Sequence, residues 1–300
     1  VELREAIQAV GDSVVVAGDE RFTRVHVHGD RPDLAIAAGL AWGRLSQVEV
    51  LDLDDQVAHN PAHAHDHGSD AAGSASAPVP VEAPATAVVA VTRAPGIADV
   101  FASYGARVVV PGDGSRPSVG EIAEGILASG ASQVVVLPND RDAILAASQA
   151  SSLTPLVTVE VVPTRNAAEG SAAVCAFDPE ASLEVNVGRM REESEALRSF
   201  RVITAAKDSV IDGKDVARGQ ILAIDASRHL LAAGDDVETV TIKALSTYEE
   251  FELVTLYCGD SEGGGASADL CERIELSGFG AEVEVINGGQ PHDHLLVAVE

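Results

Sequence analysis

Two histidines separated by one residue are the first candidates for chemistry in this chain. His26 and His28 alternate with Val25 and Val27 in the segment TRVHVH. Residues i and i+2 of a strand share one face and lie about 7 Å apart, so two imidazoles there can converge on one zinc ion or one anionic group. We expect both histidines on the exposed face of a strand, with Val25 and Val27 on the buried face. The alternative is a strand that carries ordinary polar histidines.

The second candidate site is a polar corner behind an apolar run. Residues 134–137 are an unbroken apolar segment, typical of a strand buried on both faces of a parallel sheet. Pro138, Asn139 and Asp140 follow it, and Ile144 continues at helical spacing. Ligands of open α/β sheets gather beyond the carboxyl ends of the strands, so this corner is a predicted site. The alternative is that Asn139 or Asp140 is a simple helix cap.

Strand and helix patterns alternate around that corner from residue 87 onward. Strands are predicted at residues 88–91, 107–110, 133–137 and 157–162, and helices at 97–104, 119–129, from 143, and at 167–177. Such alternation predicts a mostly parallel sheet with helices on both faces. A surface helix at 182–197 leads to a strand-rich second lobe of mixed strands and hairpins, with strands at 201–206, 220–224, 230–232, 253–257, 282–286 and 295–299, helices at 237–245 and 268–276, and a turn at 287–291.

The first fifth of the chain has a different pattern. A helix at residues 2–10, strands at 14–16 and 23–28, a helix after Pro32 and a strand at 48–51 predict an α+β domain. It resembles a ferredoxin-like unit that lacks its first strand, so we expect truncation at the amino end. The sequence predicts three parts: a domain at 1–55, a linker at 56–86 rich in His, Ala and Pro, and an α/β domain at 87–300. We interpret the linker histidines as part of a solvated tether; the alternative is weak metal chelation by His59, His63, His65 and His67.

Composition excludes several classes of partner. The chain has 20 Lys and Arg against 47 Asp and Glu, a formal charge of −27, which disfavours nucleic acid and anionic membrane surfaces. No apolar run approaches the about 20 residues of a membrane span, so we expect no integral membrane segment. Three dispersed cysteines without a CxxC pair fit a reducing cytoplasm. Phosphate-loop, GxGxxG, GxSxG and HExxH motifs are absent from the sequence, and no catalytic residue is predicted.

Several phrases are similar to the bacterial fatty acid kinase family, the DhaL/YloV-type proteins related to dihydroxyacetone kinases. They include HVH at 26–28, LPN at 137–139, PT at 163–164, AFDPEASLEVN at 176–186 and NGGQP at 287–291. The phrases follow the family's order and cover both predicted domains. The loop at 111–118, PGDGSRPS, departs from the family's pattern.

The resemblance implies a middle domain associated with dimerisation and a C-terminal domain with a DegV-like, dihydroxyacetone-kinase-like fold. It also implies a separate DhaL domain, absent from this chain, that binds ATP and Mg²⁺. In the family, a fatty-acid-binding carrier protein presents the acid that is phosphorylated to acyl phosphate for phospholipid synthesis. We therefore expect a non-catalytic docking portion of an ATP-dependent kinase, inactive alone, cytoplasmic and homodimeric. The alternatives are a stand-alone metal- or small-molecule-binding protein that uses His26 and His28, and a purely structural dimerisation module.

The family's motifs also indicate site residues. By resemblance, the histidine pair falls on His26 and His28, a predicted zinc site that is incomplete because the family's cysteine ligand would precede Val1. The predicted contacts with a partner or ligand are Pro138, Asn139, Asp140, Pro163, Thr164, Gly288, Gly289 and Gln290.

Overall fold

The computed structural model describes residues 3, 6, 7, 9–18, 23–28, 31–45, 48, 84–112, 116–260 and 268–300. The chain divides into two compact units, Val1–Glu82 and Ala83–Glu300. Most of the predicted linker and the predicted strand at 48–51, apart from Val48, lie outside the described residues. Each unit is described below by itself.

The first unit contains an antiparallel hairpin and a helix. Strand β1 (Asp12–Gly18) pairs with β2 (Thr23–His28), and helix α2 (Pro32–Trp42) follows. Val25 and Val27, which the sequence predicts on the buried face, are half-buried. Helix α2 begins with a proline at its first turn, where the missing N–H leaves no hydrogen bond unmade.

The second unit begins with the predicted parallel sheet. Its four strands lie in the order β4 (Arg107–Val109), β3 (Thr86–Val91), β5 (Gln133–Leu137) and β6 (Thr158–Val161), all parallel. The connecting helices are α4 (Pro95–Ser103), α5 (Val119–Ala128) and α6 (Ile144–Ala150), which continues into a short 3₁₀ turn, η2 (Ser151–Leu153). Helices α7 (Ala167–Cys175) and α8 (Leu183–Ala196) then lead to the second lobe.

A six-stranded mixed sheet forms the second lobe. Its order is β11 (Leu230–Gly234), β10 (Ile221–Asp225), β7 (Arg198–Thr204), β14 (Asp293–Val299), β12 (Leu253–Gly259) and β13 (Glu282–Gln290). Only the β12–β13 pair of this sheet is parallel. Helices α9 (Val237–Leu245) and α10 (Ala268–Leu276) belong to this lobe, as does a ribbon of β8 (Ser209–Ile211) and β9 (Lys214–Val216).

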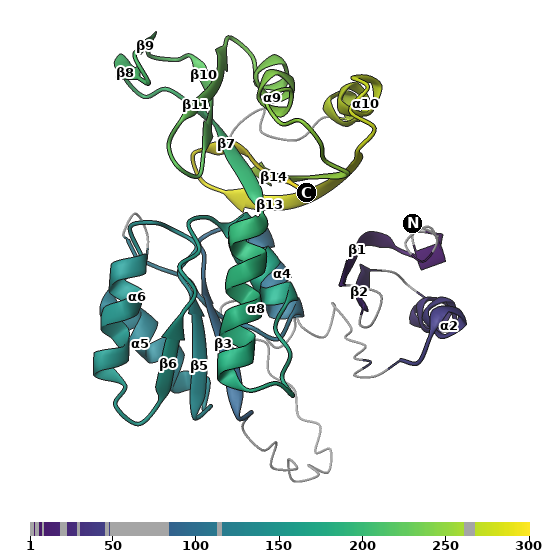
Figure 1. Ribbon diagram of the computed structural model, residues 1–300, viewed down its shortest axis with the longest axis vertical. Coiled ribbons are helices and arrows are strands. Elements are labelled where there is room, and N and C mark those ends of the chain that lie inside the picture. Colours follow the sequence, from purple (N-terminus) through teal and green to yellow (C-terminus); the bar gives the residue numbers. More distant parts are fainter. Residues whose placement is uncertain are drawn as a thin grey trace, which may run out of the picture. The chain divides into compact units, whose positions relative to one another are not determined.

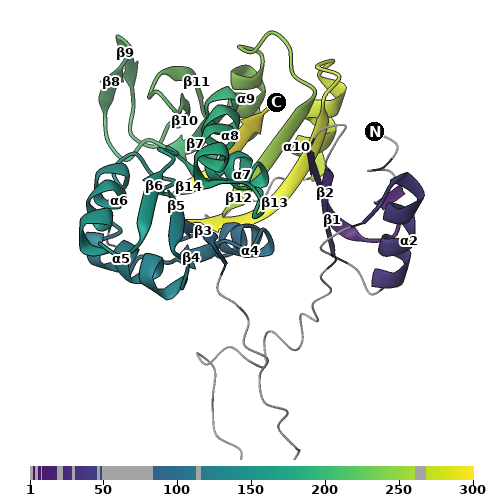
Figure 2. The same cartoon turned by 60° about the horizontal axis from the view of Figure 1, so that its bottom comes forward.

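The two sheets lie in two lobes, one above the other in Figure 1 and seen from another side in Figure 2, and the lobes share a central core. Helices α5 and α6 cover one face of the parallel sheet, while its other face packs on α4, α7 and α8. The same central core includes Tyr257, Leu296 and Ala298 from the mixed sheet. Helices α9 and α10 cover the mixed sheet's opposite face. The two lobes are therefore joined by one buried apolar layer, in which Phe101 and Met190 have no exposed surface.

Three predictions of secondary structure were wrong. Strand β7 begins at Arg198 rather than at residue 201, because Ser199 and Phe200 are buried in the ladder. The Asp212-Gly213 turn, with both residues at positive φ, joins the short strands β8 and β9, which were not predicted. Residues 287–290 are not a turn but the end of β13, and the chain reverses only at Pro291 and His292.

Candidate partner-binding edge of the second unit

The carboxyl ends of β3, β5 and β6 meet at one edge, as predicted. The Asn139 backbone N–H donates to Thr164 Oγ1 at 3.0 Å, and the Thr164 hydroxyl donates to Asn139 Oδ1 at 2.8 Å. Asn139 Nδ2 also donates to the Val91 carbonyl at the end of β3, at 3.1 Å. One asparagine therefore ties three neighbouring strands together, and its φ of 54° is the left-handed conformation that asparagine tolerates.

Helix α7 packs directly against this asparagine. A Cβ added at Gly170 would lie 2.0 Å from Asn139 Oδ1, so only glycine allows the helix this close. Asn166 caps α7 by accepting from the Glu169 backbone N–H at 3.0 Å. The carboxylate of Glu169 is buried, and it accepts from the backbone N–H and the guanidinium of Arg165. Buried charge is tolerated here because it is paired and hydrogen-bonded.

The edge continues into the mixed sheet through polar contacts. Asn166 Nδ2 donates to Ser199 Oγ on β7 at 2.9 Å. Arg201, two residues further on β7, donates to both carboxylate oxygens of Asp293, with Nε to Oδ2 at 2.9 Å. Burial lowers the pKa of Arg201, but the hydrogen bond and charge of Asp293 outweigh it, so the pKa is raised. The charge of Asp140 acts on Arg201 in the same direction, so the predicted corner borders this ion pair.

The NGGQ segment, residues 287–290 at the end of β13, packs against the start of α4. A Cβ at Gly96 would lie 1.7 Å from the Asn287 carbonyl oxygen, and one at Gly289 would lie 3.0 Å from the Pro95 ring. Gln290 is buried, and its Nε2 donates to the Tyr257 carbonyl at 2.6 Å. Gly289 has a φ of +68°, which favours glycine for conformational reasons as well. The segment therefore fixes β13 against the parallel sheet's carboxyl edge.

The structure brings the predicted residues of the second unit into two neighbouring sets. Pro163 is exposed and Asp140 half-buried, whereas Pro138 and Thr164 are buried, and Asn139 uses its polar groups within the protein. Gly288, Gly289 and Gln290 lie beside the start of α4, which follows β3. The sequence analysis missed Gly170 and the ion pair of Arg201 with Asp293. The N-x-x-E spacing of Asn166 and Glu169 was a readable capping signal.

The histidine pair lies on the other unit. His28 pairs with Asp12 and His26 with Val15 in the β1–β2 ladder. Their side chains lie outside the described part of the structure, so the zinc site stays a prediction. Among the described residues there is no cluster of three or more His, Cys, Asp or Glu side chains suited to a metal ion.

Two buried side chains with hydroxyl groups, Tyr257 and Ser171, lie in the second unit. Burial raises the pKa of Tyr257 far above its ordinary value, and the Ser171 hydroxyl of α7 counteracts only part of this. Both side chains are buried, Tyr257 with 5% and Ser171 with 7% exposed. Tyr257 belongs to the apolar core, so these hydroxyl groups form no open site.

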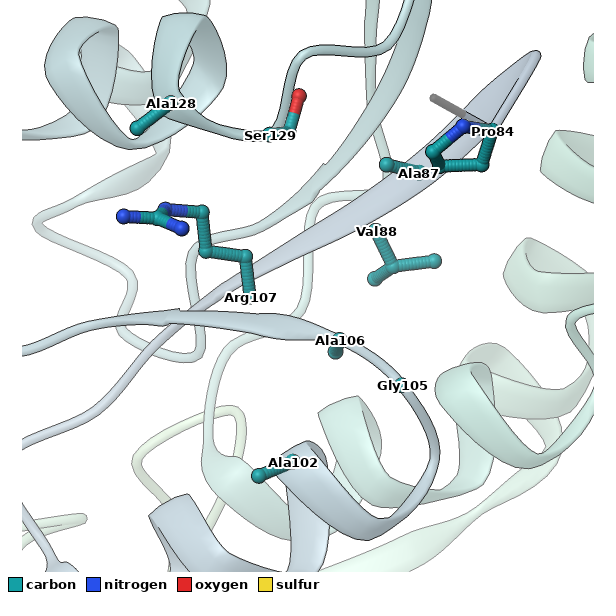
Figure 3. Close-up of a pocket in the computed structure, with 9 residues that line it drawn as sticks. All are labelled: Pro84, Ala87, Val88, Ala102, Gly105, Ala106, Arg107, Ala128 and Ser129. Atoms are coloured by element: carbon teal, nitrogen blue, oxygen red, sulfur yellow. The ribbon is translucent and has the colours of Figure 1, made fainter. Parts of the chain in front are cut away.

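A shallow pocket lies at the opposite end of the parallel strands. It has a volume of about 290 Å³ and is lined by the start of β3, the end of α4 and the end of α5 (Figure 3). Its lining consists mostly of small residues, with Pro84, Val88 and Arg107 as the larger side chains. None of the predicted site residues lines it, so we place the candidate site at the polar edge instead. No helix in the described part of the chain is long and apolar enough to cross a membrane.

Comparison with known proteins gives matches along the whole chain. A family model for the C-terminal domain of FakA-like fatty acid kinase proteins matches residues 87–300, and one for the middle domain of the same family matches residues 1–60. A Staphylococcus haemolyticus protein is 30% identical over 300 residues, covering 99% of this chain and 53% of that protein. A Staphylococcus aureus protein is 27% identical over 304 residues, covering 100% and 53%. This chain thus spans about half the length of these curated relatives.

Solved structures resemble the second unit in fold. A DegV family protein from Thermus thermophilus, whose structure is described as fatty acid binding, superposes with a TM-score of 0.52 at 14% identity, covering 72% of this chain and 99% of that one. A DegV family protein from Corynebacterium glutamicum gives a TM-score of 0.52 at 15% identity, covering 72% and 97%. The predicted DegV-like fold is confirmed.

Proposed function

Because this chain belongs to the FakA-like family of fatty acid kinase proteins, we propose that it is the docking portion of a fatty acid kinase. In this proposal it docks a fatty-acid-loaded carrier protein so that a separate ATP-binding domain can phosphorylate the acid. That domain supplies ATP, Mg²⁺ and phosphoryl transfer, and the product is an acyl phosphate for phospholipid synthesis. The chain alone is inactive.

The filled central layer is the observation that carries the proposal. The fold is that of a protein described as fatty acid binding, yet the space between the two sheets is occupied by Phe101, Met190 and Leu296, all under 4% exposed. Pockets for small ligands are typically about 300–1,000 Å³ and enclosed. The pocket of about 290 Å³ is lined by several exposed residues instead. This supports a DegV-like body that binds a protein rather than an acyl chain.

The polar edge is the proposed contact with the carrier. Pro163 is exposed and Asp140 half-buried, so both are available to a partner, while Asn139 and Thr164 hold the corner in place from behind. The half-exposed guanidinium of Arg201 lies beside them. The proposed contact is therefore a rigid corner with both carboxylates and guanidinium groups at its rim.

Helix α2 supports the homodimer. Leu34, Leu40 and Trp42 are 41%, 58% and 51% exposed, and α2 contains no buried residue. Leu34 and Trp42 share one side of the helix because their spacing is i, i+8, and exposed apolar side chains that share a face are typical of an association site. Light scattering should give a dimer that Leu34→Ser with Trp42→Ser converts to a monomer. A variant that carries both changes and is still a dimer would exclude α2 from the dimer contact.

Competition tests the docking proposal directly. The longer enzyme, with its ATP-binding domain restored, is assayed for acyl phosphate formation with a loaded carrier. The isolated chain should inhibit that reaction and should form no acyl phosphate by itself. Pro163→Glu with Asp140→Lys should remove the inhibition, whereas Leu127→Glu, on the exposed side of α5, should not. Failure of the wild-type chain to compete at saturating concentration would contradict the proposal.

A further inference from the structure

The mixed sheet ends in a long strand whose outer edge has no backbone partner in the described structure. Strand β13 spans nine residues, Glu282–Gln290, and pairs on one side only, with β12. In the two larger sheets, the other edge strands, β4, β6 and β11, have three to five residues. Prolines 155 and 163 also flank β6, and prolines are a common protection of exposed edges. Strand β13 itself contains no proline, and Pro291 comes only after its end.

The register shows which backbone groups face outward. The Glu282 N–H donates to the Glu252 carbonyl, and Glu282 aligns with Leu253 in the parallel ladder. Residues 282, 284 and 286 therefore direct their N–H and C=O groups at β12, and residues 283 and 285 direct theirs away. No hydrogen bond joins the outward groups of Val283 and Val285 to any described residue. Further along, the close approach of Gly96 to the Asn287 carbonyl ends the open stretch.

Side chains along this stretch select the kind of strand that fits. The open stretch reads Glu-Val-Glu-Val-Ile from residue 282, with no basic residue. Val285 is 42% exposed. Opposite charges directly across two strands stabilise the pair, whereas like charges destabilise it, by roughly 0.2–1 kcal/mol. A second copy of β13 centred on residue 284 would place Glu284 opposite Glu284, and one centred on residue 283 would place Glu282 opposite Glu284. The chain's net charge of −27 adds to that repulsion.

We propose that β13 is a strand-addition site, at which Val283 and Val285 pair with an extended basic segment of a partner protein. The segment alternates basic and apolar residues over about five positions, because α4 ends the open edge at Asn287. Backbone hydrogen bonds give the affinity, and the two glutamates select the charge, as in other β-augmentation sites. This site is independent of the proposed carrier contact at the polar edge.

A labelled peptide tests the site. The probe is fluorescein-Gly-Ser-Val-Val-Lys-Val-Lys-Gly-Ser-amide, which places its lysines opposite Glu284 and Glu282 in an antiparallel register. Fluorescence anisotropy should show binding to the chain, and a probe with both lysines replaced by glutamate should bind at least tenfold more weakly. Equal binding of the two probes would overturn the proposal.

Proline substitutions separate this edge from the other sheet's edge. Val285→Pro removes an outward N–H without touching the β12 ladder and should weaken binding at least tenfold. Val159→Pro, at the matching outward position of β6, should leave binding unchanged. Equal effects of both changes would mean that the peptide binds elsewhere. Circular dichroism checks that each variant folds.

Methylated probes keep the test independent of protein variants. N-methylation of the probe's fourth and sixth residues, the valines opposite Val285 and Val283, should abolish binding because those amides face β13. N-methylation of the central lysine should not, because its amide points away. Equal binding of the valine-methylated and the lysine-methylated probe would contradict strand addition.

Discussion

Asn139 and Thr164 exchange two hydrogen bonds across the carboxyl edge of the parallel sheet, at 3.0 and 2.8 Å. The two residues are 25 positions apart, one after β5 and the other after β6. Because the same asparagine also holds the Val91 carbonyl of β3, this pair sets the geometry of the proposed docking corner. The contribution of this hydrogen-bonded pair to the stability of the second unit can be measured.

Thr164→Val should destabilise the second unit. The change removes the acceptor of the Asn139 N–H and the donor to its Oδ1, and unsatisfied buried polar groups cost about 1–3 kcal/mol each. Thr154 is equally buried, but its hydroxyl makes only longer local bonds, of 3.3 and 3.4 Å, to the Ser151 and Ala150 carbonyls. Thr154→Val is therefore the control and should cost less. Urea unfolding measures both, and equal losses would contradict the role of Thr164.

Gly170→Ala should be destabilising by about 1–3 kcal/mol, the usual cost of overpacking. The added methyl would lie 2.0 Å from Asn139 Oδ1, so either the helix or the asparagine must move. Gly188 lies in the exposed surface of α8, with no atom within 4 Å of an added Cβ. Gly188→Ala should stabilise by about 0.5–1 kcal/mol through helix propensity. Thermal unfolding of the two variants should shift in opposite directions.

The sequence predicts those parts of the fold that depend on local pattern. The apolar run at residues 134–137 and the helices predicted at 119–129 and 237–245 each appear in a short window, and the corresponding elements form. The β8–β9 ribbon was not predicted, because its strands have three residues each, too few to show the alternation of apolar and polar residues that marks a strand.

The candidate site was predictable only in part, because its residues meet through the fold. The Asn139 corner follows from its position after a buried strand, by the general rule for α/β sheets. Arg201 and Asp293 are 92 positions apart, so no spacing connects them. Gly170 is constrained by Asn139 across the edge, and nothing near residue 170 in the sequence indicates that contact.

The capping box of α5 predicts a pH dependence. Hydrogen bonds from the Ser118 backbone and hydroxyl, and then from the Gly112 backbone, lower the pKa of Glu121. The folded state thus favours the carboxylate, so its stabilising effect is present above the ordinary glutamate pKa and is lost as pH falls through the lowered one. Glu121→Gln should destabilise the protein at pH 7, and the difference should shrink in acid.

Glu124→Gln is the matched control for that experiment. Glu124 lies exposed on the same helix, one turn further on, and takes no part in the cap. Its replacement should leave the pH profile of unfolding unchanged. A Glu121→Gln profile parallel to wild type at every pH would show that the cap contributes no proton-linked stability.

The Arg201 and Asp293 ion pair should contribute more than the ion pair of Arg116 with Asp142. Arg201→Met leaves the Asp293 carboxylate, whose side chain is 10% exposed, without its guanidinium. Breaking a buried pair costs about 3–5 kcal/mol, and because Arg201 is half-exposed we expect about 2 kcal/mol. Arg116 and Asp142, 2.8 Å apart, are 75% and 40% exposed, so Arg116→Met should cost about 0–1 kcal/mol.

The double variant Arg201→Met with Asp293→Leu tests whether the ion pair stabilises the fold or whether its loss matters only because one charge is left without a partner. With both charges removed, no desolvated carboxylate remains, and urea unfolding should show that most of the loss caused by Arg201→Met is recovered. A double variant as unstable as the single one would mean that the pair orients β7 against β14 through its geometry as well as its charge. Equal costs for Arg201→Met and Arg116→Met would exclude a special role for this pair at the edge.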